Sequence, residues 1–379
     1  MNDPAKSLVL VTGVGPDLKN KPPEEPHFMN KRIITTMAAL SLIALALTGC
    51  GAATDTAGAK SPPTGAAAGS DQVAPEYSGT AFDAEITNNS LAVSPDEKTA
   101  VVSDSREKSI RVYDLAAGGL IKKIGGFGTP RNIVFINEGS QFVVSDSTLG
   151  TLRFYGTEDY ALQDEVVVGP GAFGTAVSPD GKTMYVNNQA HSSVTVVDLE
   201  ARKPTDVITG FSRPRQGIKV SPDGKRVFVT NFEGDKVTVV DADSKQILRE
   251  LTGFSKIRGI SVTADGNTLY AANSGRNSIS VVDLRNGDKT NEIEVGREPY
   301  GAALSPDGTL LFASNKADNT IDVIDVTENS VVKTLEGFKE PRQAIVFSPG
   351  QDRAYVLNRD LSVARVNVEG LSLTDTIRE

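Results

Sequence analysis

Cysteine, histidine and tryptophan are scarce in this chain of 379 residues, which has one cysteine, two histidines and no tryptophan. A single cysteine excludes a disulfide framework and a thiolate metal cluster. His191 is the one histidine beyond residue 50, so this part of the chain cannot build a multi-histidine metal site. Ser192 and Ser193 are too local to His191 for a convincing Ser-His-Asp triad. We therefore predict no metal, no cofactor and no catalytic residue.

Long apolar runs are also missing beyond residue 50. None approaches the ~20 residues that cross a bilayer, and no segment keeps the 3.6-residue apolar period of an amphipathic helix. The formal net charge is −9. An acidic balance argues against a protein that coats nucleic acid. The pattern favours a β-rich domain without a nucleic-acid partner.

One apolar stretch near the N-terminus is typical of an export signal. Lys31 and Arg32 precede the apolar residues 33–47, and the sequence Leu-Thr-Gly-Cys follows, ending at Cys50. A positive region, an apolar region and terminal small residues make a secretory signal, and the last four residues resemble a lipobox. We expect residues 1–28 to be a mis-assigned upstream extension, 29–49 the lipoprotein signal peptide and Cys50 the lipidated N-terminus. The alternative is an ordinary signal peptide with a chance cysteine.

Residues 50–78 consist largely of Ala, Gly, Ser, Thr and Pro. Such a segment cannot bury enough apolar surface to offset its ordering entropy, so we expect a flexible tether. The export signal and the tether together predict an exported protein with the membrane as a partner through its lipid anchor. Its expected place is the outer face of the cell membrane, or the outer membrane and periplasm.

Residues 79–379 contain seven copies of one unit. A polar residue that ends a strand recurs at spacings of 42 or 43 residues, at Asp104, Asp146, Asn188, Asn231, Asn273, Asn315 and Asn358. About ten residues before this position, most copies have a turn such as Ser178-Pro179-Asp180-Gly181, in which proline presets φ and glycine supplies a positive φ. Each copy has room for four short strands. The spacing therefore predicts an all-β fold, a seven-bladed β-propeller of four-stranded antiparallel blades.

The copies at residues 178–188 and 221–231 resemble the YVTN family of β-propeller repeats, and the resemblance covers about residues 86–379. It implies the propeller scaffold and carries over no active-site residue. Two copies depart from the turn pattern, with Ile136-Asn137-Glu138-Gly139 in the second and Ser348-Pro349-Gly350-Gln351 in the seventh. The chain opens on an inner strand and closes on an outer one, so we expect no exchanged closing strand.

Recurring aspartates follow the third strand of most copies. Because aspartate at such a position accepts backbone N–H groups in Asx turns, we interpret these residues as structural rather than as metal ligands. They are Asp114, Asp198, Asp241, Asp283 and Asp325. The set from Asp104 to Asn358 lies nearer the channel mouth and leaves both a structural and a functional interpretation open.

Arginines recur where the chain enters the innermost strands, and these entries should ring one end of the propeller axis. A funnel of guanidinium groups, aromatic walls and amides would suit an anionic ligand. The alternative is that each arginine bonds to the next blade and holds neighbouring blades together. Asp104, Asp146 and Glu298 could then neutralise part of the cluster. The predicted ligand-binding residues are Arg131, Arg215, Arg258, Arg342, Phe173, Tyr300, Gln216 and Gln343.

Two functions are consistent with this pattern. The first is a membrane-tethered, extracytoplasmic binding module. It would bind an anionic small molecule, polymer or protein at the channel mouth. The second is a lactonase-like or other hydrolytic enzyme that uses the propeller channel. A hydrolase needs a metal or an activated base, and the sequence offers neither clearly. We expect a monomeric binding module rather than an enzyme.

Overall fold

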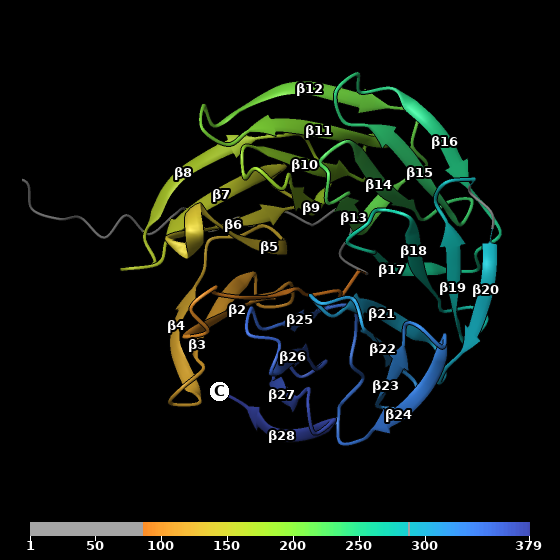
Figure 1. Cartoon of the computed structure of the whole chain (residues 1–379). Helices are drawn as coiled ribbons and strands as arrows, with labels where there is room; N and C mark the ends of the chain where they lie inside the picture. The colour runs from red at the N-terminus through yellow and green to blue at the C-terminus, as the bar shows by residue number, and fades with distance from the viewer. Residues whose placement is uncertain (1–85, 287–288) are drawn as a thin grey trace, which may run out of the picture. The chain divides into compact units, whose positions relative to one another are not determined.

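A computed structural model describes residues 86–286 and 289–379 of the chain. The predicted extension, signal peptide, tether and lipidation site Cys50 lie outside these residues. Within them, the strands form seven four-stranded antiparallel sheets arranged in a ring (Figure 1). The predicted seven-bladed β-propeller is confirmed. No helix in the described ranges is long and apolar enough to cross a membrane.

The strands recur in the order that the repeat predicts. The first strands of the blades are β1 (Leu91–Val93), β5 (Pro130–Ile136), β9 (Ala172–Val177), β13 (Pro214–Val220), β17 (Ile257–Val262), β21 (Pro299–Leu304) and β25 (Ile345–Phe347). The second strands are β2 (Thr99–Asp104), β6 (Gln141–Asp146), β10 (Thr183–Asn188), β14 (Arg226–Asn231), β18 (Thr268–Asn273), β22 (Leu310–Asn315) and β26 (Arg353–Leu357).

The third and fourth strands of each blade, which form its outer half, recur in the same order. The third strands are β3 (Ser109–Asp114), β7 (Thr151–Gly156), β11 (Ser193–Asp198), β15 (Lys236–Asp241), β19 (Ser278–Asp283), β23 (Thr320–Asp325) and β27 (Val363–Asn367). The fourth strands are β4 (Gly119–Ile124), β8 (Leu162–Val167), β12 (Lys203–Thr209), β16 (Ile247–Leu251), β20 (Lys289–Glu294), β24 (Ser330–Leu335) and β28 (Ser372–Ile377).

Each sheet consists of four consecutive strands, including the first sheet, β1 to β4, and the last, β25 to β28. The expectation of no exchanged closing strand is confirmed. The first strand of a blade lies toward the centre of the ring and the fourth toward its outside (Figure 1). Strands alternate in direction, so every first strand begins at one face of the ring, called here the mouth face. The tight turn after the first strand lies on the opposite face, called here the turn face.

The serine-proline-aspartate turns have the geometry that their sequence favours. In the fourth blade, Ser221 Oγ donates to Asp223 Oδ1 at 2.5 Å and accepts from the Arg226 N–H at 2.9 Å. Gly224 has a φ of 73°, which its missing Cβ permits. The second blade departs here, since a short 3₁₀ turn, Asn137–Gly139, replaces the motif. In the seventh blade Asp352 takes the aspartate's part, because Ser348 Oγ donates to its Oδ1 at 3.0 Å.

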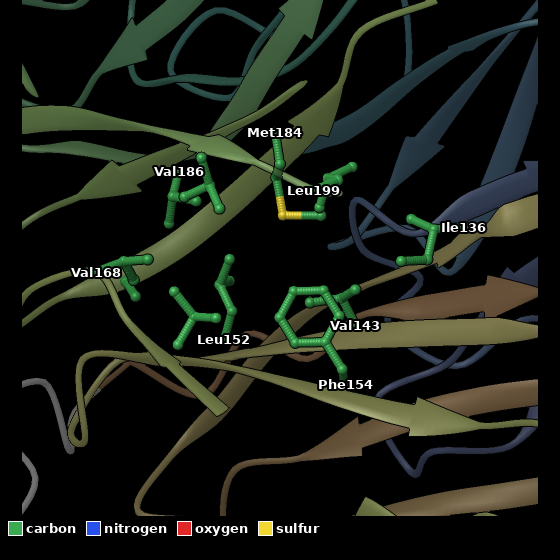
Figure 2. Close-up of a cluster of buried hydrophobic side chains, with 11 residues drawn as sticks. Ile136, Val143, Leu152, Phe154, Val168, Met184, Val186 and Leu199 are labelled. Atoms are coloured by element: carbon green, nitrogen blue, oxygen red, sulfur yellow. The ribbon is translucent and has the colours of Figure 1, made fainter. Parts of the chain in front are cut away.

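The core consists of apolar side chains between neighbouring blades. Figure 2 shows one such cluster, in which Leu152 and Phe154 of β7 face Met184 and Val186 of β10. All four side chains are buried. The alternation of apolar residues along the second and third strands thus fills the space between two sheets, because successive strand residues point to opposite faces. Burial of these faces holds the inner strands in place around the axis.

Candidate functional site

The polar residue at the end of each second strand lies beneath the loops of the mouth face. These side chains are almost fully buried, and most accept hydrogen bonds from the loop that enters the first strand. Asn231 Oδ1 accepts from the Ser212 N–H at 2.7 Å, and Asn358 Oδ1 accepts from the Lys339 N–H at 2.9 Å. Asp146 accepts from the Gly128 and Thr129 N–H groups. The geometry assigns these positions a structural part, since they fix the loops that carry the mouth residues.

A second repeated contact fixes the backbone of the mouth residues themselves. The residue one place earlier in the second strand donates to a carbonyl at the start of the next blade. Asn187 Nδ2 donates to the Arg215 carbonyl at 2.6 Å, and Ser314 Oγ donates to the Arg342 carbonyl at 2.6 Å. Ser103 does the same for Arg131 at 2.8 Å. The backbone of these three arginines is therefore held by the blade before each.

Glycines let adjacent first strands approach closely at the mouth. A Cβ on Gly174 would lie 2.4 Å from the Gln216 carbonyl oxygen, and one on Gly259 would lie 2.9 Å from the Ala302 nitrogen. Both values are far inside van der Waals contact, so neither position accepts a larger residue without a shift of its neighbours. The close approach narrows the mouth and brings the side chains beside these glycines together.

Three of the predicted arginines lie in a series that alternates with aromatic rings. The Arg215 guanidinium carbon is 3.4 Å from the centroid of the Phe232 ring, and that of Arg258 is 5.7 Å from the same ring. Arg258 and Arg342 lie on Tyr300, at 5.0 and 6.0 Å from its centroid. Because aromatic faces attract cations, the two rings keep three like charges in one place. We call Arg215, Arg258 and Arg342 with Phe232 and Tyr300 the arginine cluster.

The cluster contains guanidinium groups without counter-ions. The side chains of Arg215 and Arg258 make no hydrogen bond and no ion pair with any residue in the described ranges, and the Nε atom of each is buried. Burial and the nearby Arg258 charge lower the pKa of Arg215 to about 10. A guanidinium has five N–H donors in a planar fork that fits oxyanions. Two such groups thus have donors to offer to a ligand.

Arg342 is anchored more firmly than the other two. Its Nη1 donates to Asn88 Oδ1 at 2.8 Å and to the Thr87 carbonyl at 3.2 Å. Tyr300 Oη donates to the same Asn88 oxygen at 3.4 Å. Burial lowers the pKa of Arg342. The segment before β1 therefore contributes the seventh blade-entry side chain, a neutral amide, to the mouth.

The predicted amides connect the cluster to the channel. Gln216 and Gln343 line a narrow cavity beside Arg215 and Arg258, and they also line the central channel, whose cavity volume is about 420 Å³. The Gln216 Oε1 atom is buried and has no hydrogen-bond partner. Such a volume is of the size that takes a small ligand. The cluster and the channel thus form one continuous site.

The side chains of Arg131 and Phe173 do not lie in the funnel where the sequence predicted them. Arg131 is 1% exposed, and it donates from Nε to Ser147 Oγ at 3.0 Å and from Nη1 to the Ile86 carbonyl at 2.6 Å. Its guanidinium stacks 4.7 Å from the centroid of the Phe173 ring, which is fully buried. Neither side chain reaches the channel. For Arg131 the alternative interpretation holds, since it joins its blade to the segment before β1.

Among the described residues, the acids near the mouth form no ion pair with the arginine cluster. Asp104 Oδ2 pairs with Arg111 at 2.9 Å, and Glu298 Oε2 pairs with Lys316 at 2.7 Å. The Lys316 ammonium lowers the pKa of Glu298. Asp146 is occupied by backbone N–H groups. The carboxylates that the sequence offered as partners therefore have other partners.

Two contributors, Phe232 and Asn88, were not among the predicted site residues. Phe232 follows the end of β14, where the other copies have small, polar or charged residues, namely Ser105, Ser147, Gln189, Ser274, Lys316 and Arg359. That departure from the repeat is the signal that could have revealed it. Asn88 precedes the first recognisable turn motif, so only its distance from Ser94 marks it as the blade-entry residue.

The remaining candidates from the sequence fall outside the site. The predicted Asx turns are present, as Asp114 Oδ1 accepts from the Ala116 and Ala117 N–H groups at 2.8 Å. Asp198 and Asp325 do the same in their blades. No group of three or more His, Cys, Asp or Glu side chains gathers to hold a metal ion in the part of the chain that the structure describes.

Comparison with known proteins places this fold among similar ones. A family model described as lactonase, 7-bladed beta-propeller, matches residues 161–253 and 246–346. These ranges include Arg215, Arg258, Tyr300 and Arg342. No curated protein matches the chain. A solved structure, hydrazine synthase of Kuenenia stuttgartiensis, shares 17% identity over 77% of this chain and 99% of its own, with a TM-score of 0.66. At this identity the likeness shows the fold alone.

Proposed function

We propose that this propeller is a non-enzymatic binding module whose mouth takes an oxyanion, a carboxylate or a phosphate, between Arg215, Arg258 and Arg342. The observation that carries the proposal is that, among the described residues, the side chains of Arg215 and Arg258 have no hydrogen-bond acceptor and no counter-ion. A buried donor without an acceptor costs about 1–3 kcal/mol, and like charges at short range repel. An oxyanion would remove both penalties at once. Gln216, Gln343 and the Tyr300 ring would contact the rest of the ligand.

The test is binding of inorganic phosphate and hexanoate by calorimetry to the wild-type propeller and to Arg258→Met. We expect a loss of about tenfold or more in the variant, because a hydrogen bond to a charged group contributes about 1.5–3 kcal/mol. The affinity should fall as salt is added. The melting temperature should change little, since the guanidinium makes no described hydrogen bond to another blade, and the loss of its contacts with the Phe232 and Tyr300 rings is offset by relief of its repulsion with Arg215.

The matched control is Arg285→Met. Arg285 lies on the turn face, exposed, and pairs with Asp283 at 2.6 Å. This variant makes the same change in net charge far from the mouth, so its phosphate affinity should equal that of the wild type. Equal affinity in Arg258→Met and Arg285→Met, or a large drop in melting temperature for Arg258→Met alone, would contradict the proposal and favour a structural part for the cluster.

The proposal includes export and attachment to a membrane through a lipid on Cys50. It rests on the signal-like residues 29–49 and on the lipobox-like sequence that ends at Cys50. Two or three acyl chains hold a protein firmly, at about 0.8 kcal/mol per buried CH₂. Cys50→Ala should leave a precursor that is soluble or unprocessed. Membrane fractionation of that variant with unchanged processing would show that the lipobox interpretation is wrong.

A second candidate is hydrolysis of lactones in the channel, favoured by the match to the lactonase family model. Opening a lactone yields a carboxylate, which the arginine cluster would bind. The test is hydrolysis of a series of γ- and δ-lactones by the wild type and by Arg258→Met. Turnover by the wild type that Arg258→Met lacks would support this candidate over binding alone. Equal rates with and without the protein would remove it.

A further inference from the structure

Among the residues that the structure describes, Lys219 is the one charged side chain that lines the cavity of the central channel. The side chains that line the 420 Å³ cavity are otherwise apolar or neutral, contributed by β1, β5, β9, β13, β17 and the region of β25. Lys219 also lines a second cavity of about 290 Å³ toward the turn face, with Ser261, Leu304 and Ser305. It therefore lies at the end of the channel opposite the arginine cluster.

The internal repeat provides six controls for this position. In β13, Lys219 pairs across the strands with Phe228. The residues that occupy the same register in the other blades, each paired with an aromatic residue or a valine, carry no charge. They are Ala92, Val134, Ala176, Ser261, Ala303 and Val346. Nothing in the blade architecture requires a lysine there, since six copies form without one.

Lys219 has no partner in the described ranges. No described residue joins the Lys219 ammonium by a hydrogen bond or an ion pair. The side chain is exposed to the channel, but the surrounding walls restrict its hydration, and this burial lowers the pKa of the Lys219 ammonium. The walls of β1, β5, β9, β17 and β25 present no carboxylate to it. An ammonium in such a place is stabilised by an anion that enters the channel.

The two cationic ends of the site lie on the same strand. Arg215 and Lys219 are four positions apart on β13, so about 13 Å at most separates their Cα atoms. Gln216 and Gly217 lie between them and line the channel cavity. A ligand that fills this cavity from the mouth would extend along β13 toward Lys219.

We propose that Lys219 binds a second oxyanion group of the ligand, so that the site takes elongated molecules with an acidic group at each end. This inference rests on the proposed function, since the first acidic group occupies the arginine cluster. The ligand class is then the straight-chain dicarboxylate or a molecule of the same charge pattern. The apolar walls contributed by Ile133, Val134 and Ile218 suit a hydrocarbon middle.

The test compares dicarboxylates from succinate to sebacate with monocarboxylates of equal length, by calorimetry. The proteins are the wild type, Lys219→Met and Lys225→Met. Lys225 is exposed in the turn that follows β13 and does not line the channel cavity, so its variant makes the same charge change outside the site. At one or more lengths the dicarboxylate should bind the wild type and Lys225→Met about tenfold more tightly than its monocarboxylate, as one charged hydrogen bond contributes. Lys219→Met should lose this gain and keep its monocarboxylate affinity.

The outcomes separate this inference from the proposed function. If monocarboxylates bind the wild type and need Arg258, while no dicarboxylate binds more tightly, the mouth site stands and the Lys219 inference is overturned. A gain that survives in Lys219→Met overturns it as well. If neither acid nor phosphate binds the wild type, the proposed function fails, and this inference fails with it. Binding should also take up protons, because an anion beside Lys219 raises the pKa that burial has lowered.

Discussion

Nη1 of Arg342 donates a hydrogen bond to Oδ1 of Asn88 at 2.8 Å, and 254 positions of the chain separate the two residues. The contact joins the entry of the seventh blade to the segment before the first blade. Arg131 donates from Nη1 to the backbone carbonyl of the same Asn88 at 3.2 Å. The segment before β1 thus bridges the second and seventh blades while it presents one neutral amide to the arginine cluster.

Asn88→Ala should destabilise the propeller by about 1–3 kcal/mol, because it removes an acceptor from a partly buried guanidinium. That corresponds to a fall in melting temperature of about 2 °C per kcal/mol for a domain of this size. Asn88→Asp keeps the acceptor and adds a carboxylate beside three arginines, so it should raise the melting temperature. It should also weaken phosphate binding, since the new carboxylate occupies the cluster. Tighter phosphate binding by Asn88→Asp would contradict this account.

Ring closure without an exchanged strand depends on contacts between the first and last blades. Arg111 Nη1 donates to Glu379 Oε2 at 2.6 Å, and its Nη2 donates to the buried Asp104 at 2.9 Å. Arg111→Met should cost about 3–5 kcal/mol, because it leaves the buried Asp104 charge without its counter-ion, held only by the Arg106 and Glu107 N–H groups. Glu379→Gln removes only a half-exposed partner and should cost about 0.2–1 kcal/mol. Chemical denaturation of both variants measures the difference, and equal costs would disprove it.

The lowered pKa values of the turn aspartates predict that the propeller loses stability in acid. The Ser221 hydroxyl, by donating to Asp223, lowers the pKa of that carboxyl below 3.8. A pKa lowered in the folded state contributes stability above the unfolded value, and this contribution is lost as pH falls through the folded value. Denaturation midpoints should therefore decrease below about pH 4. Ser221→Ala should raise the pKa of Asp223, followed by NMR titration, and an unchanged pKa would show that another contact sets it.

The spacing of Asp104 to Asn358 predicts the blade number correctly because each copy must supply the same four strands to close one ring. The Asx turns are equally local, since Asp114 needs only the next three residues to make its hydrogen bonds. The contacts of each arginine, in contrast, are not set by its neighbours in the sequence. Arg131 and Arg215 occupy similar places in the repeat, yet Arg131 is buried against Phe173 and the carbonyl of Ile86, 45 residues away. Such neighbours come from the ring as a whole.

Variants of Tyr300 test whether its aromatic face or its hydroxyl group organises the arginine cluster. Its ring lies between the guanidinium groups of Arg258 and Arg342, and its hydroxyl donates to Asn88. Tyr300→Phe keeps the aromatic face, so phosphate affinity should change by less than about threefold, as one weak neutral hydrogen bond is lost. Tyr300→Leu removes both cation–π contacts, each about 0.5–2 kcal/mol.

Without the ring, the two arginines repel each other and no longer converge on one place. Phosphate affinity of Tyr300→Leu should therefore fall by about tenfold or more. The melting temperature of Tyr300→Leu should be lower than that of the wild type. It should recover when sulfate or phosphate is added at high concentration, because an anion then replaces the ring in holding the guanidinium groups together. If Tyr300→Phe and Tyr300→Leu lose affinity equally, the hydroxyl and not the aromatic face organises the cluster.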